Sequence, residues 1–578
     1  MVTDRGLGFS ALVGSVLGAS VAAWTAAFVA TVTGSLDRGV AAVGLAAGLV
    51  AGLLAARATL APETGGKEGE PGRDSSSRSR GGPILDVLAL VAFGVVSVRQ
   101  FGWLVFERAG ELRTLIANNY GDLPLHWTYV EFLAAGAPFW PENPIVAGER
   151  LRYPFAVDLL TSQLVVLGLG MRVLLPLIGL AGAAATAFAL RRWGGALAVA
   201  GFLFSGGLAG FEVLWTGRLV DYQDAVAWKN LFLALFVPQR GLLLAVPVGL
   251  LLLWSWRRRL LRGEPALAPW VEGLLWGTLP LVHLHTFLVV SLLWAVWSLG
   301  AGRLRVALPS LAWAAVPATW SVWQVSDGFR AASLAGWAPG WTIGDAHPIG
   351  FLLLNFGLFL PLTIAALVIA WRERRREHLL VLPPALVFFG ALFVVRVAPW
   401  AWDNTKIMLW CYLLALPSIG ALVLDRLSWP LRASAVVGLL FSGAVCVTAA
   451  SVGGRRLEVL DVAEHDAVCR ALQDAALTGR VATAPTFNHP VALCGHPIVA
   501  GYAGHLWSHG IDGSRVNAAL ETLMLGQPGW RDAARKVGAG YVFWGHREAT
   551  EWAASTRPWE SLAPAVARGS WGALYRVN

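Results

Sequence analysis

Residues 231–254 read LFLALFVPQRGLLLAVPVGLLLLW, an apolar stretch whose only strongly polar side chains are Gln239 and Arg240. A helix of this length can cross a hydrocarbon core of about 30 Å. A charged side chain within such a helix is costly and is usually paired or functional. The stretch therefore predicts a transmembrane helix that carries one buried polar position.

Apolar stretches of this kind recur throughout the first 452 residues, and the composition agrees with a membrane protein. Hydrophobic residues make up 56% of the chain and charged residues 14%, against roughly 45–50% and about 25% in soluble domains. A soluble enzyme, a nucleic-acid-binding protein and a disordered scaffold are thereby excluded for the whole chain. About thirteen transmembrane helices are predicted, near residues 8–32, 39–60, 83–106, 171–190, 195–212, 231–254, 268–283, 286–300, 304–323, 349–371, 379–397, 405–425 and 433–452.

Short basic loops set the predicted orientation. Arg residues follow apolar runs in five clusters, at 191–192, 257–262, 303–305, 372–376 and 426–432. Such loops stay in the cytoplasm, so we expect the N-terminus inside and the C-terminal region outside, with residues 155–170 lying along the outer surface. This placement explains the net charge of +9 without a nucleic-acid partner. The sequence thus predicts an integral protein of a bacterial plasma membrane, in contact with membrane lipids.

Two domains are predicted, a transmembrane domain over residues 1–452 and a soluble α/β domain over 453–578. The first contains a Gly/Ser-rich segment at 61–82, which we expect to be disordered, and a large first outer loop at 107–170. Short strands are expected near 480–484, 540–544 and 571–576. Cys469 and Cys494 would pair if the second domain faces an oxidising compartment.

Several short motifs follow one another in a fixed order. They are NNYGDLPLH at 118–126, PENP at 141–144, LRYP at 151–154, FVPQR at 236–240, WDNTK at 402–406 and GYAGHLWSHG at 501–510. The order of the first three motifs resembles the GT-C superfamily of membrane glycosyltransferases, which use polyprenyl-phosphate sugars. The last three motifs look similar to segments of an uncharacterised bacterial branch of that superfamily. The resemblance implies a polytopic α-helical, GT-C-like domain whose first outer loop carries a catalytic acidic residue. It also implies a polyprenyl-phosphate sugar donor and a glycan or lipid acceptor as partners.

Asp122 is the predicted catalytic base, because inverting transfer requires a group that deprotonates the acceptor hydroxyl. His126 lies four residues on and would share a helical face with Asp122, where it would orient Asp122 or contact the donor phosphate. An alternative is that Asp122 is only the N-cap of a helix beginning at Leu123. Many superfamily members carry two adjacent acidic residues here. Asp122 is followed by Leu123 instead, so a divalent metal cofactor is not evident and the metal requirement stays open.

Three cations are predicted to bind the donor phosphate, namely Arg240, Arg396 and Lys406. The planar guanidinium of Arg240 suits a phosphate, and cations at the outer helix ends would stabilise the leaving phosphate. The alternatives are structural. Arg240 would pair with a carboxylate such as Asp221 or Asp224, and Lys406 would form an ion pair with Asp403.

Further residues are predicted to bind the acceptor or to support the site, namely His126, Asp221, Asp224, Asp403, His505 and Trp507. The spacing of Asp221 and Asp224 would place both carboxylates on one helical face, where they would suit hydroxyl groups or a cation. His283 and His285 are interpreted as buried core histidines unless their helix is broken.

The predicted function is transfer of a sugar from a polyprenyl-phosphate donor to an acceptor at the outer leaflet. Two alternatives stay open, a transporter or flippase of lipid-linked sugars and a non-catalytic glycan-binding relative. Transporters often contain internal repeats, and none is visible here.

Overall fold

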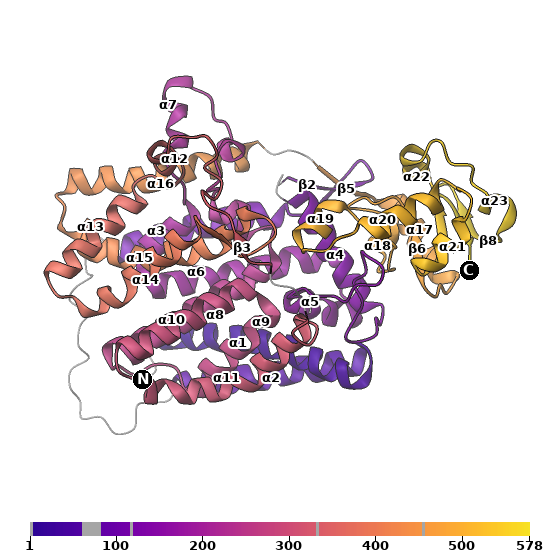
Figure 1. Cartoon of the computed structure of the whole chain (residues 1–578). Helices are drawn as coiled ribbons and strands as arrows, with labels where there is room; N and C mark the ends of the chain where they lie inside the picture. The colour runs from indigo at the N-terminus through magenta and orange to yellow at the C-terminus, as the bar shows by residue number, and fades with distance from the viewer. Residues whose placement is uncertain (1–3, 61–81, 116–118, 331–333, 454–456) are drawn as a thin grey trace.

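The apolar stretches form a bundle of helices in the computed structural model, with a smaller α/β region at one end (Figure 1). The structure describes residues 4–60, 82–115, 119–330, 334–453 and 457–578. The predicted disordered segment at 61–82 lies outside these residues except for Gly82. The bundle helices are α1 (Asp4–Thr33), α2 (Arg38–Leu60), α3 (Gly82–Gly102), α6 (Met171–Leu203), α8 (Arg240–Trp256), α9 (Pro269–Val282), α10 (Leu284–Gly300), α11 (Leu304–Val325), α12 (Pro348–Phe356), α13 (Phe359–Arg372), α14 (Arg376–Ala391), α15 (Thr405–Leu422) and α16 (Trp429–Val452).

Seven helices of the described chain are long and apolar enough to cross a membrane, or eight if α12 and α13, bent by 91°, form one span. The prediction of thirteen is therefore not confirmed. One reason is length, since α9 has only 14 residues and α14 only 16. Another is that the two predicted helices at 171–190 and 195–212 are joined in α6, which is broken by non-helical backbone at Gly194 and Gly195.

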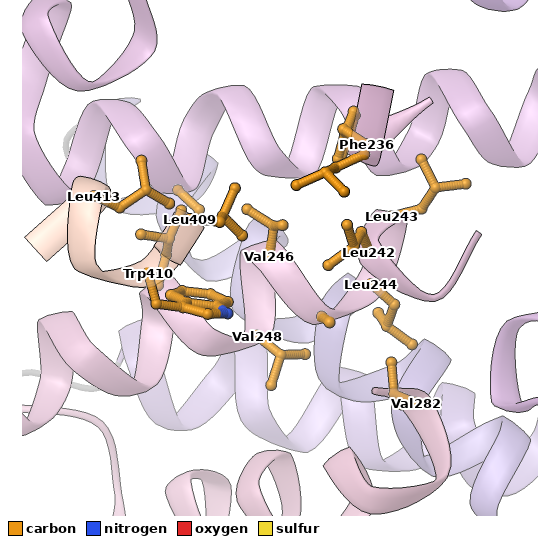
Figure 2. Packing of buried hydrophobic residues seen from close by; sticks show 14 of the residues in the cluster. Phe236, Leu242, Leu243, Leu244, Val246, Val248, Val282, Leu409, Trp410 and Leu413 are labelled. Carbon is orange, nitrogen blue, oxygen red and sulfur yellow. The ribbon is translucent and has the colours of Figure 1, made fainter. Parts of the chain in front are cut away.

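Close helix packing in the bundle depends on small residues and on interdigitating aromatic rings. A Cβ added to Gly52 of α2 would lie 2.6 Å from the Gly14 oxygen of α1, so a larger side chain cannot fit there. Helix α8 lies in the centre of the hydrophobic core, where Trp410 of α15 packs beside Val246 and Val248 (Figure 2). These contacts pack α1 against α2 and α8 against α15.

The predicted first outer loop contains two strands and two helices, β1 (Phe106–Arg108), β2 (Glu111–Thr114), α4 (Asn119–Ala134) and α5 (Ala156–Val166). Helix α5 has 11 residues, which at 1.5 Å per residue is about 16 Å and too short to cross the bilayer. It packs against α1, α2 and α8, so that its polar side chains lie inside the protein. The loop therefore contributes buried residues to the outer end of the bundle.

The C-terminal region is an α/β fold, and the three predicted strands are present in it. Strands β6 (Arg480–Ala482), β7 (Ala539–Trp544), β8 (Ala565–Gly569) and β9 (Gly572–Arg576) form a sheet in the order β6-β7-β9-β8. Only the β6–β7 pair is parallel. The helices of this region are α17 (Val462–Asp474), α18 (Pro490–Leu493), α19 (Ala503–Ser508), α20 (Ser514–Met524), α21 (Trp530–Lys536), α22 (His546–Glu551) and α23 (Trp559–Leu562).

Two of the connections that attach this region to the first outer loop are a strand pairing and a close helix contact. Strand β5 (Leu457–Asp461) pairs antiparallel with β2, which also pairs with β1. The predicted boundary at residue 453 therefore falls just before a strand that completes a sheet of the other domain. The second connection is Gly495, whose α carbon lies so close to α4 that an added Cβ would be 2.7 Å from the Glu131 backbone.

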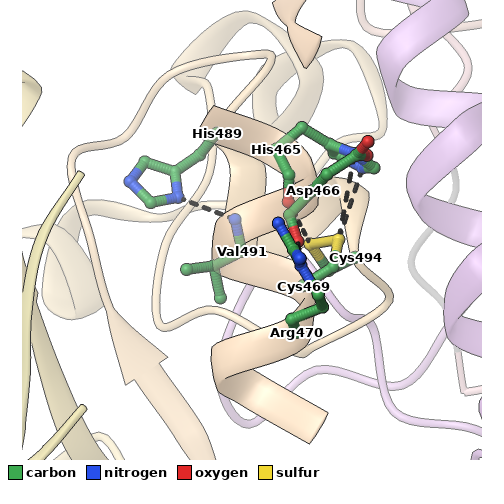
Figure 3. Close-up of a disulfide and its surroundings, with 7 residues drawn as sticks. All are labelled: His465, Asp466, Cys469, Arg470, His489, Val491 and Cys494. Carbon is green, nitrogen blue, oxygen red and sulfur yellow. Dashed lines mark hydrogen bonds and ion pairs between the residues drawn. A yellow bond between two sulfur atoms is a disulfide. The ribbon is translucent and has the colours of Figure 1, made fainter. Parts of the chain in front are cut away.

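The expected cysteine pair is formed. Cys469 of α17 and Cys494, just after α18, are joined by a disulfide (Figure 3). His465 lies one helical turn before Cys469, with its Nε2 atom 3.5 Å from the Cys469 Sγ atom. The disulfide thereby fixes α17 to the segment that packs on α4.

Candidate functional site

Asp122 lies in the first turn of α4, which begins at Asn119. The N-cap alternative is therefore wrong, because the helix starts before Asp122. The carboxylate is half-buried, and no described residue donates a hydrogen bond to it. Burial raises the pKa of Asp122, while the charges of His126 and Lys406 act in the opposite direction. Asp122 is thus a partly buried carboxylate whose pKa is raised.

His126, one turn further along α4, belongs to a buried ionic bridge. Its Nδ1 atom lies 2.8 Å from Oδ2 of Asp158 on α5, and Oδ1 of Asp158 accepts a hydrogen bond of 3.2 Å from the Arg240 Nε atom. Arg240 also donates to Thr161 Oγ1 at 2.7 Å. The bridge joins α4, α5 and α8 and fixes the helix on which Asp122 lies.

Arg240 has a structural partner, as its alternative interpretation expected, but the partner is not the one expected. The carboxylate belongs to Asp158, whereas Asp221 and Asp224 lie elsewhere. The Arg240 and Asp158 side chains are only 4% and 2% exposed. Asp158 is the residue that the sequence interpretation missed, and its signal was its position as the only acidic residue of an apolar helix.

Lys406, in the first turn of α15, forms an ion pair with Asp403 at 3.1 Å, and both side chains are largely buried. The charges of both residues act on Asp122. The predicted ion-pair alternative is thus present. The ion pair therefore lies within electrostatic reach of the Asp122 carboxylate.

Two histidines of the C-terminal region complete this arrangement. The Nε2 atom of His505 in α19 is buried without a hydrogen-bond partner among the described residues and faces Gly121, where an added Cβ would lie 3.3 Å away. The ring of His509 packs on Tyr153, with ring centroids 4.9 Å apart. Burial lowers the pKa of His505 to about 4 and that of His509 to about 3, so both rings are neutral at pH 7.

We name this set the outer polar cluster. Its members come from α4, α5, α8, α15, α19 and the turns beside them, and they are Asp122, His126, Asp158, Arg240, Asp403, Lys406, His505 and His509.

His283 and His285 lie at a true break in the membrane domain. His283 has extended backbone between α9 and α10, and its Nδ1 atom lies 2.8 Å from Thr286 Oγ1. The two rings face each other, with centroids 5.4 Å apart. His283 therefore caps α10, and the helix is broken at this pair, as the alternative to buried core histidines required.

Four predicted site residues lie outside the cluster, and three of them are charged. Asp221 caps a short helical turn through the Gln223 backbone, and Asp224 pairs with Lys229 at 3.6 Å. The two carboxylates therefore make separate contacts instead of sharing a helical face. Arg396 is exposed and donates to the Pro399 oxygen at 2.9 Å.

Trp507, another predicted site residue, is half-exposed near Trp400, with ring centroids 6.2 Å apart. Trp507 and His505 are both residues of α19, and His509 is the C-terminal capping residue of that helix. Trp507 therefore borders the outer polar cluster and does not belong to it.

The geometry for a metal ion is not found around Asp122. Across the described ranges, one group of three or more potential ligands converges closely enough, and it consists of His465, Cys469 and Cys494. Two of these are joined in the disulfide, so their sulfur atoms are not thiolate ligands. Among the described residues, no group of three such ligands includes Asp122.

The comparisons with known proteins give a distant structural likeness. The chain is similar to the Archaeoglobus fulgidus oligosaccharyltransferase in its apo form, with 13% identity, a TM-score of 0.40, and coverage of 81% of this chain and 71% of that chain. The same enzyme tethered to an acceptor peptide containing the NVT sequon gives 14% identity, a TM-score of 0.40, and coverage of 80% and 69%. No family model and no curated protein matches the sequence. A likeness at this level does not define the reaction of this chain.

Proposed function

We propose that the protein is a membrane glycosyltransferase that takes a sugar from a polyprenyl-phosphate donor and transfers it to an acceptor at the outer leaflet. The observation that carries the proposal is the half-buried Asp122 carboxylate, without a hydrogen-bonding partner among the described residues and within the field of Lys406. A base and a cation at the outer end of a helical bundle are the two groups that such a transfer requires.

In the proposed reaction, an acceptor hydroxyl attacks the anomeric carbon of the donor. Asp122 accepts the hydroxyl proton as the new glycosidic bond forms. The bond between the anomeric carbon and the phosphate oxygen breaks, and its electron pair leaves on the lipid phosphate. Lys406 stabilises the negative charge that develops there.

The remaining cluster residues are assigned supporting roles. Arg240 is satisfied by Asp158 and Thr161, so we assign it to positioning His126 and α4 instead of binding the donor. Arg396 is exposed and remains a proposed contact for the donor phosphate at the membrane surface. Asp403 holds the Lys406 ammonium, and His505 provides an unpaired ring nitrogen beside α4.

The orientation is part of the proposal. The Cys469–Cys494 disulfide supports an outer location for the C-terminal region, because disulfides persist in oxidising compartments. Since β5 of that region pairs with β2, the first outer loop lies on the same side.

The test uses the purified full chain in lipid nanodiscs with a panel of polyprenyl-phosphate sugars, and it measures release of the lipid phosphate. Asp122→Asn keeps the size of the side chain and removes the base, so release should fall by about 10²-fold or more. Asp345→Asn, an exposed carboxylate remote in sequence from every cluster residue, is the matched control and should keep the parent rate. Full release by Asp122→Asn would refute the catalytic assignment. Movement of the lipid-linked sugar across the bilayer without phosphate release would identify a transporter instead.

A further inference from the structure

Three tryptophans gather beside the outer polar cluster, and we name Trp400, Trp402 and Trp507 the indole platform. The rings of Trp400 and Trp402 have centroids 4.9 Å apart, and those of Trp400 and Trp507 are 6.2 Å apart. Trp400 is 44% exposed and Trp507 is 53% exposed. Two segments far apart in the sequence therefore present adjoining indole surfaces at the outer end of the molecule.

The platform is held in place by hydrogen bonds of the surrounding backbone. The Trp402 indole N–H donates to the Ala227 oxygen at 2.8 Å, and the Trp341 indole N–H donates to the Ala401 oxygen at 2.8 Å. At the other side, an added Cβ at Gly510 would lie 3.4 Å from Pro399, so the end of α19 packs on the turn that carries Trp400. Rings that are fixed before binding lose little conformational entropy when a ligand arrives.

Charged groups flank the platform on both sides. Trp402 directly precedes Asp403, which holds Lys406. On the other side the Lys229 ammonium lies 6.0 Å from the centre of the Trp402 ring and pairs with the exposed Asp224 carboxylate. This combination favours a ligand with both apolar and hydroxyl-bearing faces.

A sugar ring has that combination, since its C–H face stacks on an indole while its hydroxyl groups bond to carboxylates and ammonium groups. We propose that the indole platform binds a saccharide unit of the acceptor, with Asp224 and Lys229 bonding to its hydroxyl groups. The inference rests on the proposed glycosyltransferase function and deepens it by naming a carbohydrate as the acceptor. The acceptor chain then extends from the platform toward Asp122, which receives the proton of its terminal hydroxyl.

The experiment measures binding by saturation-transfer NMR, with the full chain in nanodiscs and linear trisaccharides of glucose, mannose or N-acetylglucosamine as probes. At least one trisaccharide should bind the parent chain, and Trp400→Ala and Trp507→Ala should each raise its dissociation constant by about tenfold or more. Trp507→Phe, which keeps an aromatic face, should lose less than Trp507→Ala. Trp215→Ala is the matched control, since Trp215 is 72% exposed and lies outside the platform.

Three results of the binding and fluorescence measurements would overturn the platform assignment. The first is that no trisaccharide binds the parent chain. The second is that the parent and the alanine variants bind equally. The third is that brominated lipid quenches the fluorescence of the parent but not of Trp400→Ala, because this would place the Trp400 ring in the bilayer.

Binding is also measured in Asp122→Asn, where it should persist. Saccharide binding without release of lipid phosphate would leave the platform standing and refute the transferase. Transfer with an unchanged acceptor KM in the alanine variants would refute the platform alone.

Discussion

The buried bridge between Asp158 and Arg240 allows a sharp test of how the outer polar cluster is held together. In Asp158→Ala, Arg240 keeps only Thr161 as a hydrogen-bond partner, and His126 loses its carboxylate. Breaking a buried ion pair by removing one partner costs about 3–5 kcal/mol, because the other charge is left uncompensated. Asp158 has two partners here, so we expect a loss near the upper end of that range.

The matched control is the exposed pair of Arg150 and Asp327. Its Nη1–Oδ1 distance is 2.8 Å, and both side chains are 32% exposed. Asp327→Ala should cost no more than about 1 kcal/mol, because solvent screens exposed pairs. The contrast between the two variants therefore isolates the effect of burial.

The assay is equilibrium unfolding of the purified chain in mixed micelles, with the free energy of unfolding obtained from a denaturant titration. The double variant Asp158→Leu with Arg240→Met replaces both charges by apolar groups of similar volume. It should be more stable than Asp158→Ala, since no unpaired charge remains in the interior. A double variant that is less stable than Asp158→Ala, or an Asp158→Ala loss no larger than that of Asp327→Ala, would refute the reasoning.

Three further predictions follow from the same structure. The rate of phosphate release should rise with pH through the pKa of Asp122. Because burial raises that pKa, the midpoint of the rise should lie above the ordinary value of about 3.9. A rate for the parent chain that does not fall at acidic pH would contradict this prediction. Burial lowers the pKa of His509 to about 3, so its stabilising contribution is complete above the unfolded value of about 6.5 and is lost as the pH falls toward 3. His509→Gln should therefore flatten the decrease in Tm between pH 7 and pH 5, and an unchanged slope would exclude His509 as a source of acid sensitivity. Gly52→Leu should destabilise the contact between α1 and α2 by about 1–3 kcal/mol, measured by the same unfolding titration, with Gly94→Leu as the control because a Cβ there meets open space.

Much of the fold could be predicted from the sequence because its signals are local. Apolar stretches gave helices wherever they were long enough, and the expected strands of the C-terminal region correspond to β6, β7 and β9. The spacing of Asp122 and His126 correctly indicated neighbouring turns of one helix. Two helices were predicted at 171–190 and 195–212. The structure joins them in α6, which has non-helical backbone at Gly194 and Gly195.

The partners within the site could not be predicted, because they depend on which distant segments meet. Asp158 and Arg240 are 82 residues apart. No rule of residue spacing predicts a contact between the short helix α5 and the apolar helix α8. Asp221 and Asp224 carried an equally strong local signal, yet Asp221 caps a helical turn and Asp224 pairs with Lys229. The indole platform likewise joins a turn before α15 to α19, and only the packing of the C-terminal region brings them together.

The pairing of β2 with β5 also limits the path of the chain through the bilayer. The two strands share one sheet, so they lie on the same side of the membrane, and the chain between them must cross an even number of times. The helices Met171–Leu203, Arg240–Arg262, Ala401–Arg426 and Trp429–Val452 satisfy this parity by themselves. If the bent pair α12 and α13 also crosses, the parity becomes odd, and one further segment between the strands must cross with it. A single strand pairing therefore excludes every topology with an odd number of crossings in this interval.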